Sequence, residues 1–185
     1  MRMVSGGLVA AVLLVGGAHA LTAQGNQERR GFWFGIGLGY GSLGCDGCDG
    51  REGSGSGYVA LGGTLSQRVR LGFESNGWAK EVDNETVSLG NAGAVIYFYP
   101  METGGLHLKG TAGVAAVRYE TTQGNATLSI DKTGFGWGGG LGYDVRLGRK
   151  ISLTPFGGWY WQRISSDGES TTFNFFQVGL AFVLH

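Results

Sequence analysis

The stretch TGFGWGGGLGYDV at residues 133–145 decides the fold, because it alternates between two kinds of side chain. Its even positions hold five glycines and Asp144. Its bulky apolar residues all fall on odd positions, namely Phe135, Trp137, Leu141, Tyr143 and Val145. A β-strand sends successive side chains to opposite faces, so one face of this predicted strand is large and apolar and the other is nearly bare.

The segment at residues 31–41 repeats this design. One face carries Phe32, Phe34, Ile36, Leu38 and Tyr40, and the other carries glycines together with Trp33. The same period of two, bounded by turn residues, predicts eight strands. These strands span residues 31–41, 57–66, 69–79, 86–99, 105–118, 132–145, 150–163 and 172–184. In the fourth strand both faces carry bulky residues, so the sequence leaves its register open.

The connections between the predicted strands alternate in length. Three are short turns, at residues 66–68, 100–104 and 146–149. The others are mostly longer and rich in Gly, Ser, Asp, Asn and Thr, at residues 42–56, 80–85, 119–131 and 164–171. Short turns at one end and long loops at the other are typical of outer-membrane barrels, in which the turns face the periplasm. We therefore predict an all-β fold, an eight-stranded antiparallel up-and-down transmembrane β-barrel with mobile external loops.

The size of the side chains indicates which face points outward. The interior of an eight-stranded barrel is only just wide enough for side chains, so the small residues belong inside and the large apolar residues face lipid. No apolar run reaches the ~20 residues of a transmembrane helix, and closed barrels are the only other structures that span a bilayer. Two interfacial girdles are expected from aromatic residues near the strand ends: Trp78, Trp159, Trp161 and Tyr40 near the loops, and Tyr97, Tyr99 and Tyr143 near the turns.

The N-terminal segment has the layout of a secretory signal. Arg2 provides the positive charge, the apolar stretch covers residues 8–15, and small-residue cleavage sites follow at Ala20 and Ala23. We predict a signal peptide at residues 1–23, a short lead at 24–30 and the barrel at 31–185. The protein is thus expected to be exported to the bacterial outer membrane.

The composition of the chain limits the possible partners. Its 185 residues include 38 glycines but only 2 prolines, with 14 basic and 14 acidic residues. This charge balance offers no electrostatic reason to expect nucleic acid as a partner.

The last predicted strand ends in FQVGLAFVLH. Val178, Leu180, Phe182 and Leu184 share one face of it. Another set has the spacing of the C-terminal signal that the outer-membrane assembly machinery reads: Gln177, Gly179, Phe182 and Leu184. With the signal peptide and the eight strands, residues 31–185 resemble the small OmpA/OmpX-type barrels of the outer-membrane protein β-barrel domain family.

The resemblance implies a monomeric, stand-alone barrel. Its expected partners are outer-membrane lipids, the assembly machinery and periplasmic chaperones. Family members usually end on an aromatic residue, whereas this chain ends in Leu184-His185. We expect this difference to slow recognition by the assembly machinery.

Cys45 and Cys48 form a CxxC motif in the first predicted external loop. Oxidation in exported compartments favours a disulfide at the loop tip. The alternatives are a metal site completed by Asp46 or Asp49, or free thiols. Carboxylates in the segment 42–56 also leave open a Ca²⁺ site, although no cofactor is otherwise expected.

Four charged residues share the inward faces of their predicted strands: Arg70, Glu74, Lys109 and Asp144. Charges in a narrow lumen must pair to offset the cost of desolvation. The favoured interpretation is a salt-bridged plug that closes the barrel, and the alternative is an ion path or gate.

These features predict a non-enzymatic outer-membrane protein with a structural, envelope-integrity or surface-contact role through its external loops. Two alternatives are a soluble lipocalin-like carrier, because Gly31-Phe32-Trp33 resembles the lipocalin Gly-x-Trp motif, and a lipid A-modifying barrel enzyme. Only His107 could serve such an enzyme. It follows a short turn and is therefore expected at the periplasmic end, away from the outer leaflet.

Overall fold

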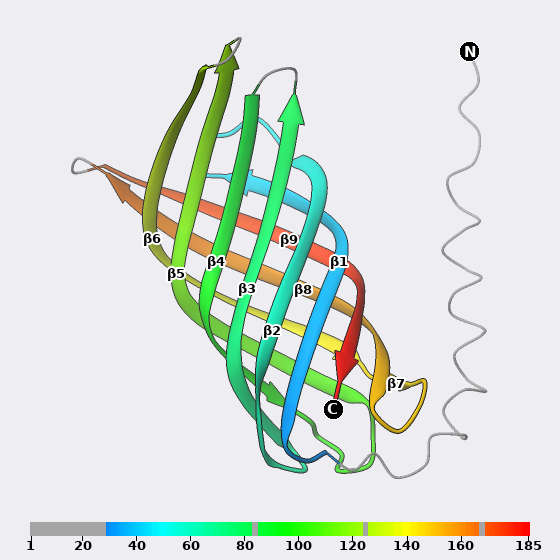
Figure 1. Cartoon of the computed structure of the whole chain (residues 1–185). Helices are drawn as coiled ribbons and strands as arrows, with labels where there is room; N and C mark the ends of the chain where they lie inside the picture. Colours follow the sequence, from blue (N-terminus) through cyan, green and yellow to red (C-terminus); the bar gives the residue numbers. More distant parts are fainter. Residues whose placement is uncertain (1–28, 83–84, 124–125, 167–168) are drawn as a thin grey trace, which may run out of the picture.

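The computed structural model describes residues 29–82, 85–123, 126–166 and 169–185, so the predicted signal peptide lies outside the described residues. The chain forms a closed, all-antiparallel barrel, which confirms the predicted fold (Figure 1). Its strands are β1 (Phe32–Cys45), β2 (Glu52–Ser66), β3 (Val69–Val82), β4 (Glu85–Phe98), β5 (Leu106–Gln123), β6 (Ala126–Tyr143), β7 (Val145–Arg146), β8 (Ile151–Ser166) and β9 (Glu169–Leu184). Among the described residues, no helix is long and apolar enough to cross a membrane.

The nine strands named above form a barrel wall of eight. β1 pairs with β9, which closes the barrel, and β6 and the two-residue β7 both pair with β8. Asp144 separates β6 from β7, yet its backbone N–H donates to the Gly105 carbonyl at 2.9 Å. β7 is therefore a short continuation of β6 beyond an interruption at Asp144.

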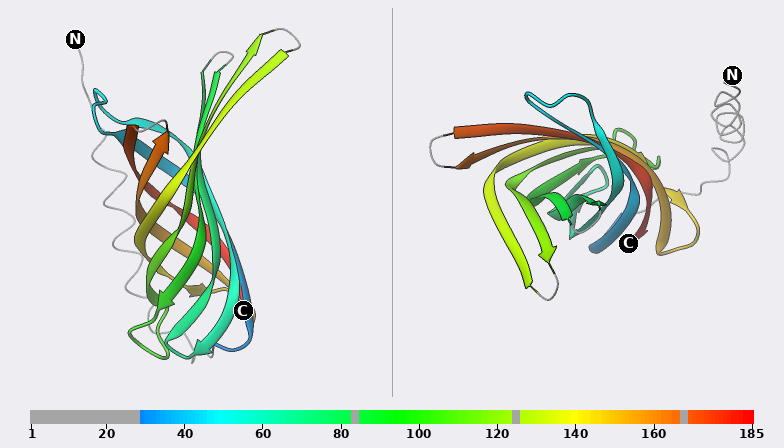
Figure 2. Two further views of the ribbon diagram at one scale, coloured as in Figure 1. Left: turned by 90° about the vertical axis from the view of Figure 1, so that its left-hand side faces the viewer. Right: turned by 90° about the horizontal axis from the view of Figure 1, so that it is seen from above.

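The two ends of the barrel differ in construction. The turn end carries the connections at residues 67–68, 99–105 and 147–150, and His185 lies there beside the start of β1 (Figure 1). At the hairpin end the strands run further than the sequence pattern predicted. Much of the predicted loops 42–56 and 119–131 is strand, because the ladders continue there, as in Tyr119↔Ile130 and Leu43↔Glu52. The hairpins β5–β6 and β8–β9 spread apart at this end (Figure 2).

The alternation of side chains sorts the surface as the sequence indicated. Outward-facing residues such as Leu38 and Leu141 are 72% and 59% exposed, and together they form an apolar belt of a size that soluble monomers rarely carry. The inward glycines are needed because side chains cross the lumen. A Cβ on Gly138 would lie 2.5 Å from the Tyr160 ring, and one on Gly142 would lie 2.6 Å from the His107 imidazole.

The predicted aromatic girdles are partly wrong. Tyr40, Trp159 and Trp161 point outward, as expected from their odd or even positions in β1 and β8. Trp78 is buried inside the barrel because it shares the inward face of β3 with Arg70 and Glu74, and Tyr97 in β4 and Tyr99 just beyond β4 are buried as well. The open register of β4 is resolved in the same way: its odd positions, including Leu89 and Val95, face inward.

Candidate functional site

Two layers of charged side chains lie in the lumen, and Glu74 is the centre of the layer farther from the turn end. Its carboxylate accepts hydrogen bonds from the Lys109 ammonium at 2.9 and 3.0 Å. Tyr97 Oη donates to the same carboxylate at 3.1 Å, and Asn76 Nδ2 donates at 3.1 Å. Glu74 is fully buried, so this set of donors offsets the cost of removing its charge from water.

Asp144 is the centre of a second layer, nearer the turn end. Thr154 Oγ1 donates to its Oδ1 at 2.8 Å, and Tyr99 Oη donates to its Oδ2 at 3.0 Å. The Arg70 guanidinium lies 3.8 Å from Asp144 Oδ2 and donates to Tyr99 Oη at 2.9 Å. The structure therefore places all four predicted lumen charges inside the barrel, as two separate ion pairs.

Arg29 lies across the turn end of the lumen, although the sequence pattern assigned it to a simple lead. Its guanidinium is 3.7 Å from the centre of the Tyr99 ring. It donates to the carbonyls of Gln67 and Glu102 at 3.0 and 2.9 Å. Its side chain is 1% exposed, so it covers the Asp144 layer from the turn side.

His185, which follows β9, extends this layer at the turn end. Burial, together with the nearby Arg70 and Arg146 guanidinium groups, lowers the pKa of its imidazole to about 3. A neutral ring fits its contacts. Nδ1 lies 2.5 Å from Arg70 Nη2 and accepts a hydrogen bond from it, and Nε2 donates to Ser152 Oγ at 2.8 Å.

The Ser152–His185 contact resembles the first half of a nucleophile–base pair. In a catalytic triad a carboxylate orients the histidine, whereas here Nδ1 of His185 faces the Arg70 cation. A base with a pKa near 3 is also far from the range that suits proton transfer at neutral pH. The pair therefore has the geometry of a structural hydrogen bond.

His107 is buried at the turn end, as its position after a short turn indicated. Its ring packs edge-on against Tyr97 at a centroid distance of 5.3 Å, and Nδ1 is 3.6 Å from Asp144 Oδ1. It thus contributes to the packing around the Asp144 layer.

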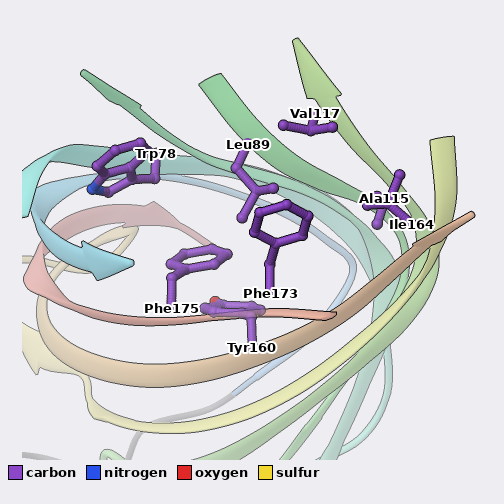
Figure 3. Close-up of a cluster of buried hydrophobic side chains, with 8 residues drawn as sticks. All are labelled: Trp78, Leu89, Ala115, Val117, Tyr160, Ile164, Phe173 and Phe175. Atoms are coloured by element: carbon purple, nitrogen blue, oxygen red, sulfur yellow. The ribbon is translucent and has the colours of Figure 1, made fainter. Parts of the chain in front are cut away.

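The hairpin half of the lumen is filled differently. Tyr160 stacks on Phe175 with centroids 4.6 Å apart (Figure 3). These rings belong to an apolar cluster inside the barrel, formed by Trp78, Leu89, Ala115, Val117, Tyr160, Ile164, Phe173 and Phe175. Also buried inside the barrel are the side-chain amides of Asn91, Gln162 and Gln177, which have no hydrogen-bond partner among the described residues.

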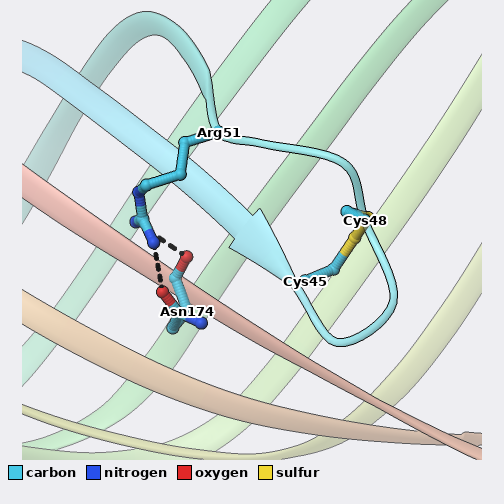
Figure 4. The surroundings of a disulfide bond; sticks show 4 residues. All are labelled: Cys45, Cys48, Arg51 and Asn174. Atoms are coloured by element: carbon cyan, nitrogen blue, oxygen red, sulfur yellow. Dashed lines mark hydrogen bonds between the residues drawn. A yellow bond between two sulfur atoms is a disulfide. The ribbon is translucent and has the colours of Figure 1, made fainter.

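Cys45 and Cys48 are joined by a disulfide at the tip of the β1–β2 hairpin (Figure 4). Near the tip, the Arg51 guanidinium ties this hairpin to β9: it donates to Asn174 Oδ1 at 2.6 Å, and it also donates to Ser42 Oγ at 3.0 Å. The described residues contain no group of three or more His, Cys, Asp or Glu side chains that could hold a metal. Asp46 and Asp49 are exposed in this hairpin, and Glu52 pairs with Lys80.

The C-terminal residues follow the predicted alternation. Phe182 and Leu184 point outward, whereas Gln177 and Gly179 lie on the inward side of β9.

The sequence pattern missed several residues of the lumen layers, namely Asn76, Tyr97, Tyr99, Thr154, Tyr160 and His185. A signal for three of them was present, because the alternation in β3 and β8 places Asn76, Thr154 and Tyr160 on the inward face of their strands.

Comparisons with known proteins agree with this geometry. Residues 8–183 match the model of a family described as outer membrane protein beta-barrel domain. A search of curated proteins found no match. Among solved structures, Neisserial surface protein A (NspA) superposes with a TM-score of 0.62 at 11% identity, over 85% of this chain and 98% of that one. Ail, the attachment invasion locus protein of Yersinia pestis, gives a TM-score of 0.60 at 10% identity, over 84% and 99%.

Proposed function

The chain belongs to the outer membrane protein beta-barrel domain family, and from this premise we propose that it is a closed, non-conducting barrel that works in surface contact through its extracellular hairpins. In such barrels the short turns face the periplasm, so the hairpin end is the extracellular one. Membership of this family also argues against the lipocalin-like alternative.

The observation that carries the proposal is the filled lumen at the turn end. The cavity among Trp33, Tyr58 and Tyr97 measures only about 10 Å³, roughly the space that one water molecule needs. Glu74 and Asp144 are fully buried beside it. A barrel blocked in this way offers a solute no continuous path, so its activity belongs at its outer end.

The extracellular end supports a contact role. Its hairpins spread apart, and the β1–β2 hairpin is held in place by its disulfide and by Arg51. Ail is named for attachment and invasion, although its likeness to this chain establishes the fold alone. Asp46 and Asp49 are exposed in the β1–β2 hairpin, whereas Glu52 is paired with Lys80, so a partner with positively charged groups would meet the two aspartates.

Further partners are proposed on the same premise. Outer-membrane lipids would cover the apolar belt, to which Leu38 and Leu141 belong. Periplasmic chaperones and the assembly machinery would receive the chain, the latter through the C-terminal strand with Phe182 and Leu184.

Conductance in planar bilayers tests the closed lumen. We expect no single-channel conductance from the wild-type barrel. Asp144→Ala removes the acceptor for Tyr99 and Thr154 and the partner of Arg70, and should produce a measurable single-channel leak. A wild-type barrel that conducts would contradict the proposal, and a silent Asp144→Ala variant would count against a gating role for this layer.

Complementation separates surface contact from envelope integrity. A deletion strain would receive either the wild-type gene or a variant whose β5–β6 hairpin is shortened by replacing residues 119–130 with Asn-Gly. Surface contact predicts that the shortened variant restores detergent resistance but not cell–cell aggregation. If the shortened variant restores both properties, the contact role of this hairpin is wrong.

A further inference from the structure

The extracellular mouth of the barrel contains a pocket of about 280 Å³ between the β1–β2 hairpin and the adjacent ends of β3 and β4. Its walls include Leu43, Trp78, Val82 and Val87 together with the Cys45–Cys48 disulfide. These side chains occupy inward positions of their strands, so they face the mouth and not the lipid. Leu43, Cys45 and Val87 also pack against the apolar cluster below, which forms the floor of the pocket.

The wall formed by the β1–β2 hairpin is tied to β9 by a hydrogen bond and closed by a disulfide. Gly47 and Gly50 adopt φ angles of 84° and 108°, which side-chain-bearing residues rarely adopt, so the turn depends on glycine there. The Asp46 backbone N–H donates to the Thr172 carbonyl at 3.0 Å, which ties the turn to β9. A wall fixed in this way needs little ordering when a ligand binds.

The charged residues at the rim of the pocket determine whether a ligand should be positively or negatively charged. Lys80 donates to Glu52, and this contact pairs the ammonium group with one carboxylate. Glu85, the third charged residue that lines the pocket, has no ion-pair partner among the described residues. The rim therefore has one more negative than positive group, next to apolar walls.

We propose that this pocket binds a small molecule that has an apolar body and a single positive charge. The apolar body would lie against Leu43, Val82 and Val87, and the cation would face Glu85. At about 280 Å³ the pocket is near the lower limit of small-molecule sites, so it suits one compact ligand. The inference goes beyond the proposed surface contact and does not depend on it, because it needs only the mouth of the barrel.

Titration with cyclohexylamine tests this site, with cyclohexanecarboxylate as the matched anion and the barrel held in nanodiscs. The indole N–H signal of Trp78 in NMR spectra reports the pocket, and that of Trp33, buried at the opposite end, is an internal reference. We expect the amine to shift the Trp78 signal saturably without moving Trp33. The carboxylate should bind at least about fivefold more weakly. Equal binding of the two probes, or no saturable Trp78 shift, would overturn the proposal.

Variants locate the probe within the mouth. Val87→Phe should fill the pocket and abolish the Trp78 shift, whereas Val114→Phe, the same change on the lipid face, should leave binding intact. Glu85→Gln should weaken amine binding about two- to fivefold, as for an exposed ion pair. If Val87→Phe does not fold by heat-modifiable gel migration, Val82→Phe fills the pocket from an exposed position. Unchanged amine binding in a folded pocket-filling variant would show that the probe binds elsewhere.

Discussion

In the turn half of the barrel interior, charged and hydroxyl side chains pair with one another beside a cluster that includes Trp33 and Tyr58, whereas the cluster in the hairpin half is mainly aromatic and aliphatic. In the turn half, Glu74 and Asp144 each accept several hydrogen bonds. In the hairpin half, Phe175 and Leu89 contribute only packing. The same alternation of inward positions thus supports two different kinds of core.

The difference follows from what each half has to do. The turn half closes the lumen, and a network of directional bonds leaves almost no free volume there. The hairpin half has to hold together strands that extend beyond the predicted ends, and a hairpin alone is only marginally stable. An apolar cluster in which β3, β4, β5, β8 and β9 all take part provides the missing burial. Charge balance should therefore govern the turn half, and side-chain volume the hairpin half.

The largest effect is expected from breaking the buried ion pair. Lys109→Met leaves the Glu74 carboxylate buried without its cation, which should lower the free energy of unfolding by about 3–5 kcal/mol. Urea unfolding in micelles measures this loss. Lys80→Met, the same change in an exposed pair, should cost at most about 1 kcal/mol. The double variant Glu74→Gln/Lys109→Met should recover much of the loss, and an equal cost for the two single Lys→Met variants would remove the distinction between the halves.

Volume in the apolar cluster should have the next largest effect. Leu89→Ala leaves a cavity among Trp78 and Phe175 and should cost about 2–4 kcal/mol in the same assay. Ile96→Ala, on the lipid-facing side of the same strand, should cost clearly less because detergent can fill the space. If both variants lose the same stability, the cluster is not a packed core.

Removing the disulfide should have a smaller effect. The Cys45–Cys48 bond closes a loop of four residues, so loop entropy predicts a loss of about 2 kcal/mol at most for Cys45→Ser/Cys48→Ser. The loss should appear as faster proteolysis at the hairpin end, with the conductance of the barrel unchanged. A leak in this variant would mean that the two halves are coupled.

The dependence on pH should be the smallest effect. The folded-state pKa of His185 is lowered to about 3, against ~6.5 in the unfolded chain. The unfolded state therefore binds the proton more readily, and this contribution to stability is complete above pH ~6.5 and falls as the pH drops towards 3. His185→Asn should reduce the slope of stability between pH 6.5 and 5. An unchanged slope would place the titration elsewhere.

Part of this architecture could be predicted because it is periodic. Alternation identified the outward apolar face, the inward glycines and the inward position of the lumen charges. The ends of the strands were predicted too short, because residues such as Ser54, Ser56 and Thr121 look like loop residues. Their strand conformation comes from ladders and from the cluster around Trp78, which a local pattern does not contain.

The aromatic residues show where the pattern failed. The positions of Tyr97 and Tyr99 near a turn suggested a membrane girdle, but Tyr97 takes an inward position in β4, and Tyr99, one residue beyond the end of β4, is buried too. Once inside, their hydroxyl groups bind Glu74 and Asp144. A tyrosine suits a membrane interface and a polar lumen equally well, so its type alone does not distinguish the two.

Outside β4, whose register stayed open, the sequence by itself determined which strand positions face inward and which face lipid, because a period of two is a local property of a strand. Only the tertiary structure decided which inward side chains meet. Glu74 on β3 bonds Lys109 on β5, and Arg70 on β3 lies beside Asp144 at the end of β6. Neither pair belongs to neighbouring strands. The curvature of the closed sheet brings these charges together across the lumen, and that curvature depends on the whole barrel.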